Sequence, residues 1–347
     1  MEFYEILQKD PAVIKQCIRQ SRDQREIFRL MTGMALRAVL IVVFAIIFIS
    51  PMTGLFGEQN SAMAVVIFCI LLAVRFVDFG YRIQDALLNL TAVFMILLTA
   101  PVAASVSGVL LRFVIHFAGF FAILFFTCDR PEMGNGGLYS FAYIFLSGNP
   151  VTGSPLFARF LMTCVGIAVC GAIFFMKHKE KHRDVTFGQK VREFSLQSRR
   201  HLWQLRAALG VSLILTITSA LQLPRFMWAG FACGAMLTDY GDKNGFREKF
   251  SRRIAGVIGG SLLFAAVYTV VPETLHAVIA PVGGVCLGFC TDYRYKTAMN
   301  CFGALTIATG LYGLNASVGL RIADNLIGVL FAAGFVFIFE KLTEKIK

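Results

Sequence analysis

The chain has 347 residues, of which 57% are hydrophobic and 16% are charged, whereas soluble globular domains contain about 25% charged residues. This composition excludes a soluble domain, and apolar blocks long enough to cross a bilayer as helices exclude a membrane β-barrel, whose strands alternate. The net charge of +12 does not indicate a nucleic-acid partner, because Lys and Arg gather in alternate loops, which is the topology signal of a membrane protein.

The apolar blocks predict an all-α polytopic membrane protein with about twelve transmembrane helices. Residues 1–29 are predicted to form a cytoplasmic amphipathic segment with a helix lying on the membrane surface, and they do not resemble a signal peptide. Two six-helix membrane repeats, residues 30–176 and 205–340, are predicted on either side of a basic cytoplasmic linker, 177–204. Residues 341–347 form a charged tail. The expected spans are about 30–50, 60–77, 83–100, 104–127, 136–148, 156–176, 205–223, 226–240, 252–271, 275–291, 297–312 and 319–339.

Loop charges predict the orientation of these spans. Lys and Arg residues occupy the N-terminal segment, the linker, the tail and the loops near 75–84, 127–137, 239–253 and 291–297. The loops on the opposite side contain one such residue, Arg225. Since cytoplasmic loops are enriched in Lys and Arg, both termini and the linker are predicted to face the cytoplasm, in a multi-pass protein of the cytoplasmic membrane.

Matching motifs predict that the two halves are parallel repeats, as six spans per half require. Leu-Arg-Ala opens the first span of each half, and an Arg lies seven residues before a Gly in the last span of each half. Gln-Ser-Arg also precedes each half. These matches are Leu36-Arg37-Ala38 with Leu205-Arg206-Ala207, Arg159 and Gly166 with Arg321 and Gly328, and 20–22 with 197–199.

Three successive spans of the second half each contain Gly-x-x-x-Gly, at Gly230 and Gly234, Gly256 and Gly260, and Gly284 and Gly288. Such small faces allow close helix packing. The nine cysteines include no Cys-x-x-Cys, and Cys286 and Cys290 are interpreted as small packing residues rather than metal ligands. No metal and no cofactor are expected.

No enzyme motif is present: the chain lacks a nucleophile elbow, a phosphate-binding loop and a His-x-x-x-His pair with a carboxylate. We therefore expect neither catalysis nor direct ATP drive. The informative residues are instead the ionisable groups inside spans, because such residues are costly in a bilayer and usually functional.

Paired arginines near the outer ends of the sixth and twelfth spans, Arg159 and Arg321, could attract an anion or snorkel to the interface. Asp324, one turn from Arg321, could be its partner or a proton-coupling group, and Asn325 lies beside it. These residues are hypotheses for substrate binding (Arg159, Arg321, Asn325) and proton coupling (Asp324).

The other ionisable groups also allow two interpretations. Arg112 and His116 share one face of the fourth span. They form either a buried pair or the lining of a cavity, in which Arg112 would bind substrate and His116 would couple protons. Asp85 is a further proton-coupling hypothesis. Trp228 is an interfacial anchor or a surface on which an aromatic substrate stacks. Four arginines near cytoplasmic boundaries are topology anchors or a vestibule that gathers anions: Arg37, Arg206, Arg252 and Arg253.

Over about residues 30–340 the chain resembles the fusaric acid resistance (FUSC) family of aromatic acid exporters, with the specific motifs in 205–330. The similarity comprises Leu205-Arg206-Ala207, Trp228, the sequence SRRIAGVIGG at 251–260, and Arg321 with Gly328. The resemblance implies a cytoplasmic-membrane exporter of small, often aromatic, carboxylates driven by the proton gradient. Many large members also contain a sizeable cytoplasmic domain, which the short linker does not provide.

Three functions therefore remain open at the level of sequence. The first is a secondary transporter that exports organic anions across the lipid bilayer, as a single chain or a homodimer. The second is a passive organic-anion channel on the same architecture, which needs no titratable coupling group. The third is a membrane scaffold or envelope protein.

Overall fold

The structure is a computed structural model that describes residues 3–241 and 243–343, and within these residues it contains helices and no strand. Twelve of the helices coincide with the twelve expected spans, and three shorter ones (α1, α2 and α9) precede the two halves. The helices are α1 (Phe3–Gln8), α2 (Pro11–Gln20), α3 (Gln24–Phe56), α4 (Ser61–Ala73), α5 (Ile83–Val106), α6 (Val109–Thr127), α7 (Asn135–Ser147), α8 (Ser154–His178), α9 (Phe187–Arg192), α10 (Arg199–Ala220), α11 (Met227–Leu237), α12 (Lys243–Val270), α13 (His276–Phe289), α14 (Tyr293–Tyr312) and α15 (Leu314–Thr343), with short 3-10 turns at Glu58–Asn60, Pro131–Met133 and Glu273–Leu275.

Seven of the described helices are long and apolar enough to cross a membrane: α3, α5, α6, α8, α10, α12 and α15. The chain is therefore a polytopic α-helical membrane protein, as predicted. Among the shorter helices, α4, α7 and α11 have only 11 to 13 residues. Most of their side chains are buried, so their neighbours rather than lipid surround them. The last residues of the expected tail, 344–347, lie outside the described residues.

The chain divides into two compact units. Unit 1 consists of Met1–Ile47 and Arg247–Ala323, and unit 2 of Phe48–Phe246 and Asp324–Lys347. Helices α3 and α15 each contribute one part to each unit.

In unit 1, glycines bring α12 and α13 against their neighbours. A Cβ atom on Gly260 of α12 would lie 2.5 Å from the Cα atom of Ala298 on α14, so the two backbones touch. Gly283 of α13 lies against Phe302 of α14. Two further glycines of α13, Gly284 and Gly288, lie against Val42 and Ala38 of α3. The Gly-x-x-x-Gly motifs thus allow the close packing that the sequence predicts.

The N-terminal segment folds onto unit 1. Ile6 of α1 and Ile14 of α2 are buried with Leu30 and Met34 of α3, and Phe289 at the end of α13 packs against this cluster. The expected amphipathic helix on the membrane surface is thus divided into two short helices, α1 and α2. The second helix begins at Pro11, with Asp10 as its N-cap. Ile6 and Ile14 of this pair are covered by Leu30 and Met34 of α3.

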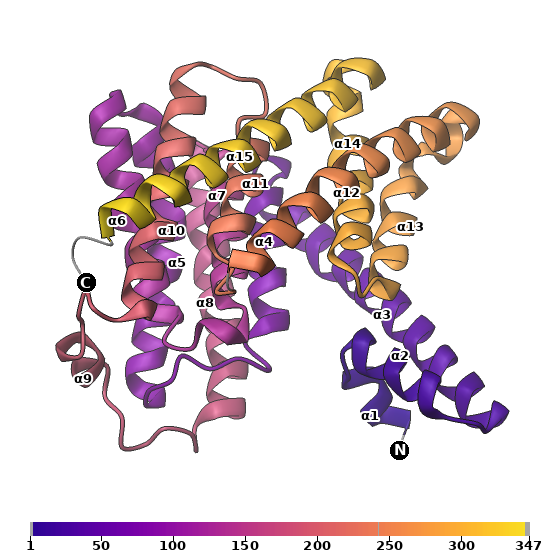
Figure 1. Cartoon of the computed structure of the whole chain (residues 1–347), viewed down its shortest axis with the longest axis horizontal. Coiled ribbons are helices and arrows are strands. Elements are labelled where there is room, and N and C mark those ends of the chain that lie inside the picture. Colours follow the sequence, from indigo (N-terminus) through magenta and orange to yellow (C-terminus); the bar gives the residue numbers. More distant parts are fainter. Residues whose placement is uncertain (1–2, 242, 344–347) are drawn as a thin grey trace. The chain divides into compact units, whose positions relative to one another are not determined.

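In unit 2, α7 is the central helix and contacts α4, α5, α6 and α11, while α10 packs along α6 and α11 (Figure 1). Small residues again permit the closest approaches. A Cβ atom added to Gly166 of α8 would lie 2.8 Å from the Ile67 side chain on α4. Gly328 of α15 touches the backbone of Ala229 on α11. These contacts fix α8 on α4 and α15 on α11.

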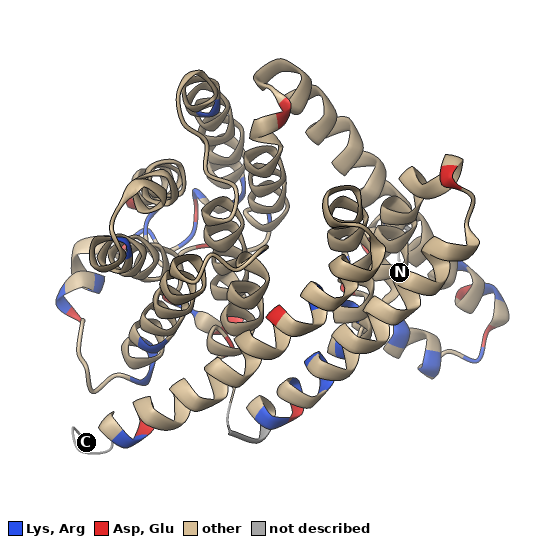
Figure 2. Ribbon diagram, turned by 90° about the horizontal axis from the view of Figure 1, so that it is seen from above, with Lys and Arg blue, Asp and Glu red and all other residues tan. Residues whose placement is uncertain are grey.

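The connections between the helices of unit 2 lie at two ends of the unit, the linker end and the opposite end. The linker end holds residues 74–82, 128–134 and 179–198, and the opposite end holds residues 57–60, 107–108, 148–153 and 221–226. Most of the helical ribbon carries no charged residue, and Lys and Arg gather near helix ends and in connections (Figure 2). The charged side chains that do lie within helices are therefore few enough to consider one by one.

The helix contact at Gly260 generates the first prediction. Gly260→Ala should lower the stability of the folded protein by about 1–3 kcal/mol, because the new methyl group meets the α14 backbone, which cannot yield cheaply. The measurement is the thermal midpoint of the detergent-solubilised protein, followed by size-exclusion chromatography.

The matched control is Gly259→Ala on the same helix, where an added Cβ meets no atom within 4 Å. Alanine is the better helix former, so this variant should be as stable as the original protein or slightly more so. Equal midpoints for the two variants would contradict the proposed close contact.

Candidate functional site

Two arginines of unit 2 sit near the start of a helix at the opposite end and bind carbonyls there. Arg112 is the fourth residue of α6, and its guanidinium donates to the carbonyls of Ala104 and Ser107 at 3.1 and 3.0 Å and to the Ser219 hydroxyl at 3.0 Å. The expected fourth span begins at residue 104, whereas α6 begins at Val109, so Arg112 lies in the first turn of its helix. Helix α5 continues through Pro101 to Val106, so the turn to α6 comes later than expected.

Arg159 of α8 is 1% exposed and has a complete set of acceptors. Its guanidinium donates to the Asn60 side-chain oxygen at 2.9 Å and to the carbonyls of Asn149 and Gln59 at 2.8 and 2.9 Å. Asn60 in turn donates to the Pro155 carbonyl. This arrangement ties the start of α4 to both sides of the α7–α8 turn, and it favours a structural role for Arg159.

His116 is buried one turn after Arg112. Its Nδ1 atom lies 3.0 Å from the hydroxyl of Tyr143 on α7, which is fully buried. The sequence analysis did not identify Tyr143 as the partner, because no spacing rule connects α6 to α7. The pair forms a polar contact in the interior of unit 2.

Trp228 occupies the first turn of α11 and is buried, with the Arg225 guanidinium 5.7 Å from its ring centre. Arg225 is the single basic residue expected in the loops on the outer side, and it adopts a left-handed backbone conformation with φ of 55°. A cation over an indole face is attracted to the ring. The geometry therefore connects the Trp228 ring to the loop before α11.

At the linker end, Asp85 lies in the first turn of α5 and binds the linker. Its carboxylate accepts the backbone N–H of Phe187 at 2.8 Å and pairs with Arg82 at 2.9 Å. The structure does not bring Asp85 to Arg112, which lies beside the last turns of α5. Asp85 is thus part of a polar network at the linker end.

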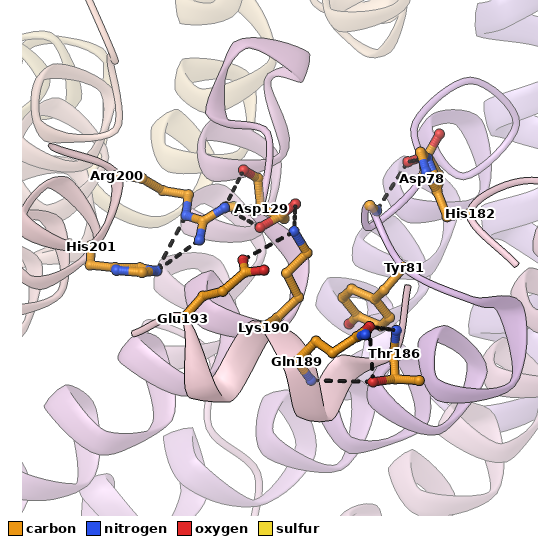
Figure 3. A network of polar contacts seen from close by, with 12 residues as sticks. Asp78, Tyr81, Asp129, His182, Thr186, Gln189, Lys190, Glu193, Arg200 and His201 are labelled. Carbon is orange, nitrogen blue, oxygen red and sulfur yellow. Dashed lines mark hydrogen bonds and ion pairs between the residues drawn. The ribbon is translucent and has the colours of Figure 1, made fainter. Parts of the chain in front are cut away.

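This network contains residues that the sequence analysis did not select. Asp129, after α6, pairs with Lys190 at 3.3 Å and with Arg200, and Asp78, after α4, pairs with His182 at 3.0 Å (Figure 3). One local signal was available in the sequence: Thr186 and Gln189 form a capping box at the start of α9, and Ser/Thr-x-x-Glu/Gln is a recognised helix-start pattern.

The four vestibule arginines lie in different environments. Arg253 of α12 is 7% exposed and donates to the Tyr293 hydroxyl at 2.7 Å, while Arg252 pairs with Asp292 at 3.4 Å and with Glu248. The contacts with Tyr293 and Asp292 join α12 to the start of α14. Arg37 is half-buried on α3, and Arg206 lies 3.5 Å from the Asp239 carbonyl in unit 2.

The remaining hypotheses for substrate binding, Arg321 and Asn325, and for proton coupling, Asp324, lie on one turn of α15. Arg321, Asp324 and Asn325 are 6%, 3% and 3% exposed. Their spacing places them on one face of the helix. Asp324 is ten residues from the start of α15, roughly 15 Å along the helix axis. This polar turn therefore lies well inside a helix that is long and apolar enough to cross a membrane.

Within the described residues, no group of three or more His, Cys, Asp and Glu side chains could hold a metal ion. His178 and His182 lie in the linker-end network, and Cys286 and Cys290 lie one turn apart at the end of α13.

The acceptor set of Arg159 generates the second prediction. Arg159→Gln should lower the free energy of unfolding by about 3 kcal/mol, because buried acceptors lose charge-assisted hydrogen bonds. Arg159→Lys should recover little, since one ammonium cannot reach three acceptors held by separate segments. Thermal midpoints in detergent test both variants.

Arg183→Gln serves as the control, because this linker arginine is 65% exposed and pairs only locally with Glu180. An exposed pair of this kind contributes little to stability. A normal midpoint for Arg159→Gln would contradict the structural role of Arg159.

Comparison with known proteins gives one match. Residues 212–335 match the model of a family described as fusaric acid resistance protein-like. The matched segment runs from α10 into α15 and includes the polar turn of α15. No curated protein matches the chain, and no solved structure does so. The match confirms the resemblance predicted from the sequence: residues 212–335 are similar to the fusaric acid resistance protein-like family.

Proposed function

We propose that this protein is a non-enzymatic secondary transporter that exports small, often aromatic, carboxylates or related organic anions across the cytoplasmic membrane, driven by the proton gradient. Two findings support a membrane transport-related role: the family match and the seven helices long and apolar enough to cross a membrane. The substrate class and the energy source follow from the resemblance and from the chemistry of the polar turn of α15.

The observation that carries the proposal is this polar turn. A guanidinium and a carboxylate, both almost fully buried, lie three residues apart inside a membrane-length helix and within the matched segment. Ionisable groups in such positions are costly and are usually retained for function. Arg321 supplies the positive charge that a carboxylate needs, Asp324 supplies a group that can gain and lose a proton, and Asn325 supplies amide donors.

The other arginines of the spans have different roles in this proposal. Arg112 and Arg159 already donate to carbonyls at helix ends, so we assign them to stability rather than to substrate binding. His116 contacts Tyr143, and Asp85 lies in the first turn of α5 and binds the linker. We prefer Asp324 as the proton-coupling residue because it lies ten residues inside a membrane-length helix and within the matched segment.

We further propose twelve spans in two parallel repeats, with both termini and the linker in the cytoplasm. Equivalent contacts within the units support the duplication. The last span of the first half packs on the second span through Gly166 on Ile67, and the last span of the second half packs on its second span through Gly328 on Ala229. Gly166 and Gly328 are the glycines that the sequence pairs.

The contacts of the first spans support the same duplication. In unit 2, α10, the first span of the second half, packs along α6, the fourth span of the first half. In unit 1, α3, the first span of the first half, packs on α13, the fourth span of the second half, at Gly284 and Gly288. The first span of each half thus packs on the fourth span of the other half, as expected if the two halves are equivalent repeats.

Flux measurements test the proposed function. Proteoliposomes with the purified protein should move labelled hydroxybenzoate uphill when a pH gradient is imposed and stop when the gradient is collapsed. Asp324→Asn should abolish uphill movement and retain exchange of labelled for unlabelled substrate, because exchange needs no net proton transfer. Arg321→Gln should weaken substrate binding roughly tenfold or more, since a charge-assisted hydrogen bond contributes about 1.5–3 kcal/mol.

The control is Asp184→Asn, which removes an exposed linker carboxylate and should leave flux unchanged. Downhill flux that ignores the gradient, and that persists in Asp324→Asn, would instead indicate a passive channel. A folded protein that moves no organic anion from a panel would contradict transport and favour a scaffold.

A further inference from the structure

The linker is not a loose connection but is docked along the linker end of unit 2. We call residues 178–201 the strap. Three carboxylates hold it, each from a different helix end: Asp78 follows α4, Asp85 begins α5, and Asp129 follows α6. The strap therefore contacts three successive ends of the membrane helices at once.

Asp78 and Asp85 hold the first part of the strap. Asp78 is 6% exposed and accepts from Lys181 at 3.3 Å and from His182 at 3.0 Å. Asp85 accepts the Phe187 N–H, and the backbone N–H of Arg82 donates to the Val185 carbonyl at 2.8 Å. The chain thus runs across the ends of α4 and α5.

Asp129 and a cluster of aromatic rings hold the second part. Lys190 and Arg200 both pair with Asp129. The Phe187 ring lies 5.3, 5.9 and 5.5 Å from the ring centres of Tyr81, Phe125 and Phe126. These rings place an apolar side chain of the strap between the ends of α5 and α6.

The strap depends on this docking for its own structure. Helix α9 has six residues, and isolated helices below about 12–15 residues are marginal in water. The Thr186–Gln189 capping box satisfies its first backbone donors. The capping box alone does not offset the conformational entropy that the strap loses when it becomes ordered. Release of the strap from the helix ends would therefore also unfold α9.

Unit 1 contains a corresponding arrangement. Cys17 and Ile18 of the N-terminal segment pack against the cluster of Ile6, Ile14, Leu30 and Met34, and so does Phe289 at the end of α13. In unit 2, Phe194 of the strap packs on Phe125, at the end of α6, with ring centres 5.9 Å apart. Each of these segments contains Gln-Ser-Arg before the next long helix. A docked segment in front of each half is thus a repeated feature.

We propose that the strap is a clamp on the cytoplasmic end of unit 2, which holds the ends of α4, α5 and α6 together and must be released before this end can open to substrate. The proposal rests on the transport function proposed above and on the cytoplasmic location of the linker. Charge holds the clamp at Asp78 and Asp129, so a competing charge or a change in either partner would release it.

Proton uptake by Asp78 is a poor trigger for release at neutral pH. Burial raises the pKa of the Asp78 carboxyl, but the adjacent His182 and Lys181 side chains and the N–H of Gly80 outweigh burial and hold this pKa below the ordinary 3.8. A lowered pKa stabilises the docked state above pH 3.8, and this contribution is lost only as the pH falls through the depressed value. Release near neutral pH therefore has to act on the ion pairs themselves.

Hydrogen exchange and flux on the full-length protein test the clamp. Asp129→Asn should expose the backbone amides of residues 185–194 to exchange roughly tenfold faster or more, as expected when a charge-assisted contact is removed. It should also increase the rate of downhill hydroxybenzoate flux. Lys190→Gln, which leaves the helix ends untouched, should change both quantities in the same direction but less.

Asp129→Glu should preserve most of the protection, because it keeps the charge. Glu180→Gln is the matched control, since Glu180 lies in the strap but pairs only with Arg183 at the surface; it should change neither exchange nor flux. Unchanged protection in Asp129→Asn would overturn the docking, and faster exchange with unchanged flux would overturn the clamp. If the original protein shows no flux, the transport function fails, while the exchange data still decide whether the strap is docked.

Discussion

A bilayer interior offers no water to carbonyl groups at helix ends, and this constraint shapes unit 2. Each time a helix stops, its last carbonyls need a donor. Arg112 supplies donors to the end of α5, and Arg159 supplies them to the turn after α7 and to the turn before α4. Both arginines therefore satisfy carbonyls at turns of unit 2, the unit in which α7 packs on four neighbours.

The same constraint separates two kinds of charged residue in the spans. Arginines near the start of a helix can serve the ends of neighbouring helices, whereas a charge in the middle of a span lies beside backbone that is already hydrogen-bonded. Asp324, ten residues after the first residue of α15, belongs to the second kind, and Arg321, seven residues after that first residue, lies between the two kinds.

Much of this fold was predictable from residue patterns. Apolar blocks predicted a polytopic α-helical membrane protein, because membrane helices must be apolar over their length, and each expected span overlaps with a helix of the described residues. Gly256 and Gly260 predicted a close helix contact, although not its partner α14. The partners of Arg159 could not be predicted, since they are two backbone carbonyls and one amide from separate turns. The turn before α6 could not be placed correctly, because the expected spans 83–100 and 104–127 were divided at Pro101, whereas α5 continues through it.

The contacts of α3 with α13 and of α10 with α6 have a consequence for biosynthesis. Helix α3 enters the membrane early, yet its packing surface on α13 lies about 240 residues later in the chain. At about 5–20 residues per second, α3 waits roughly ten to fifty seconds for its partner. During that interval its apolar surface faces lipid or the insertion machinery. The first half is also incomplete until α10 arrives beside α6, so neither half reaches its final packing while the ribosome is still translating the linker.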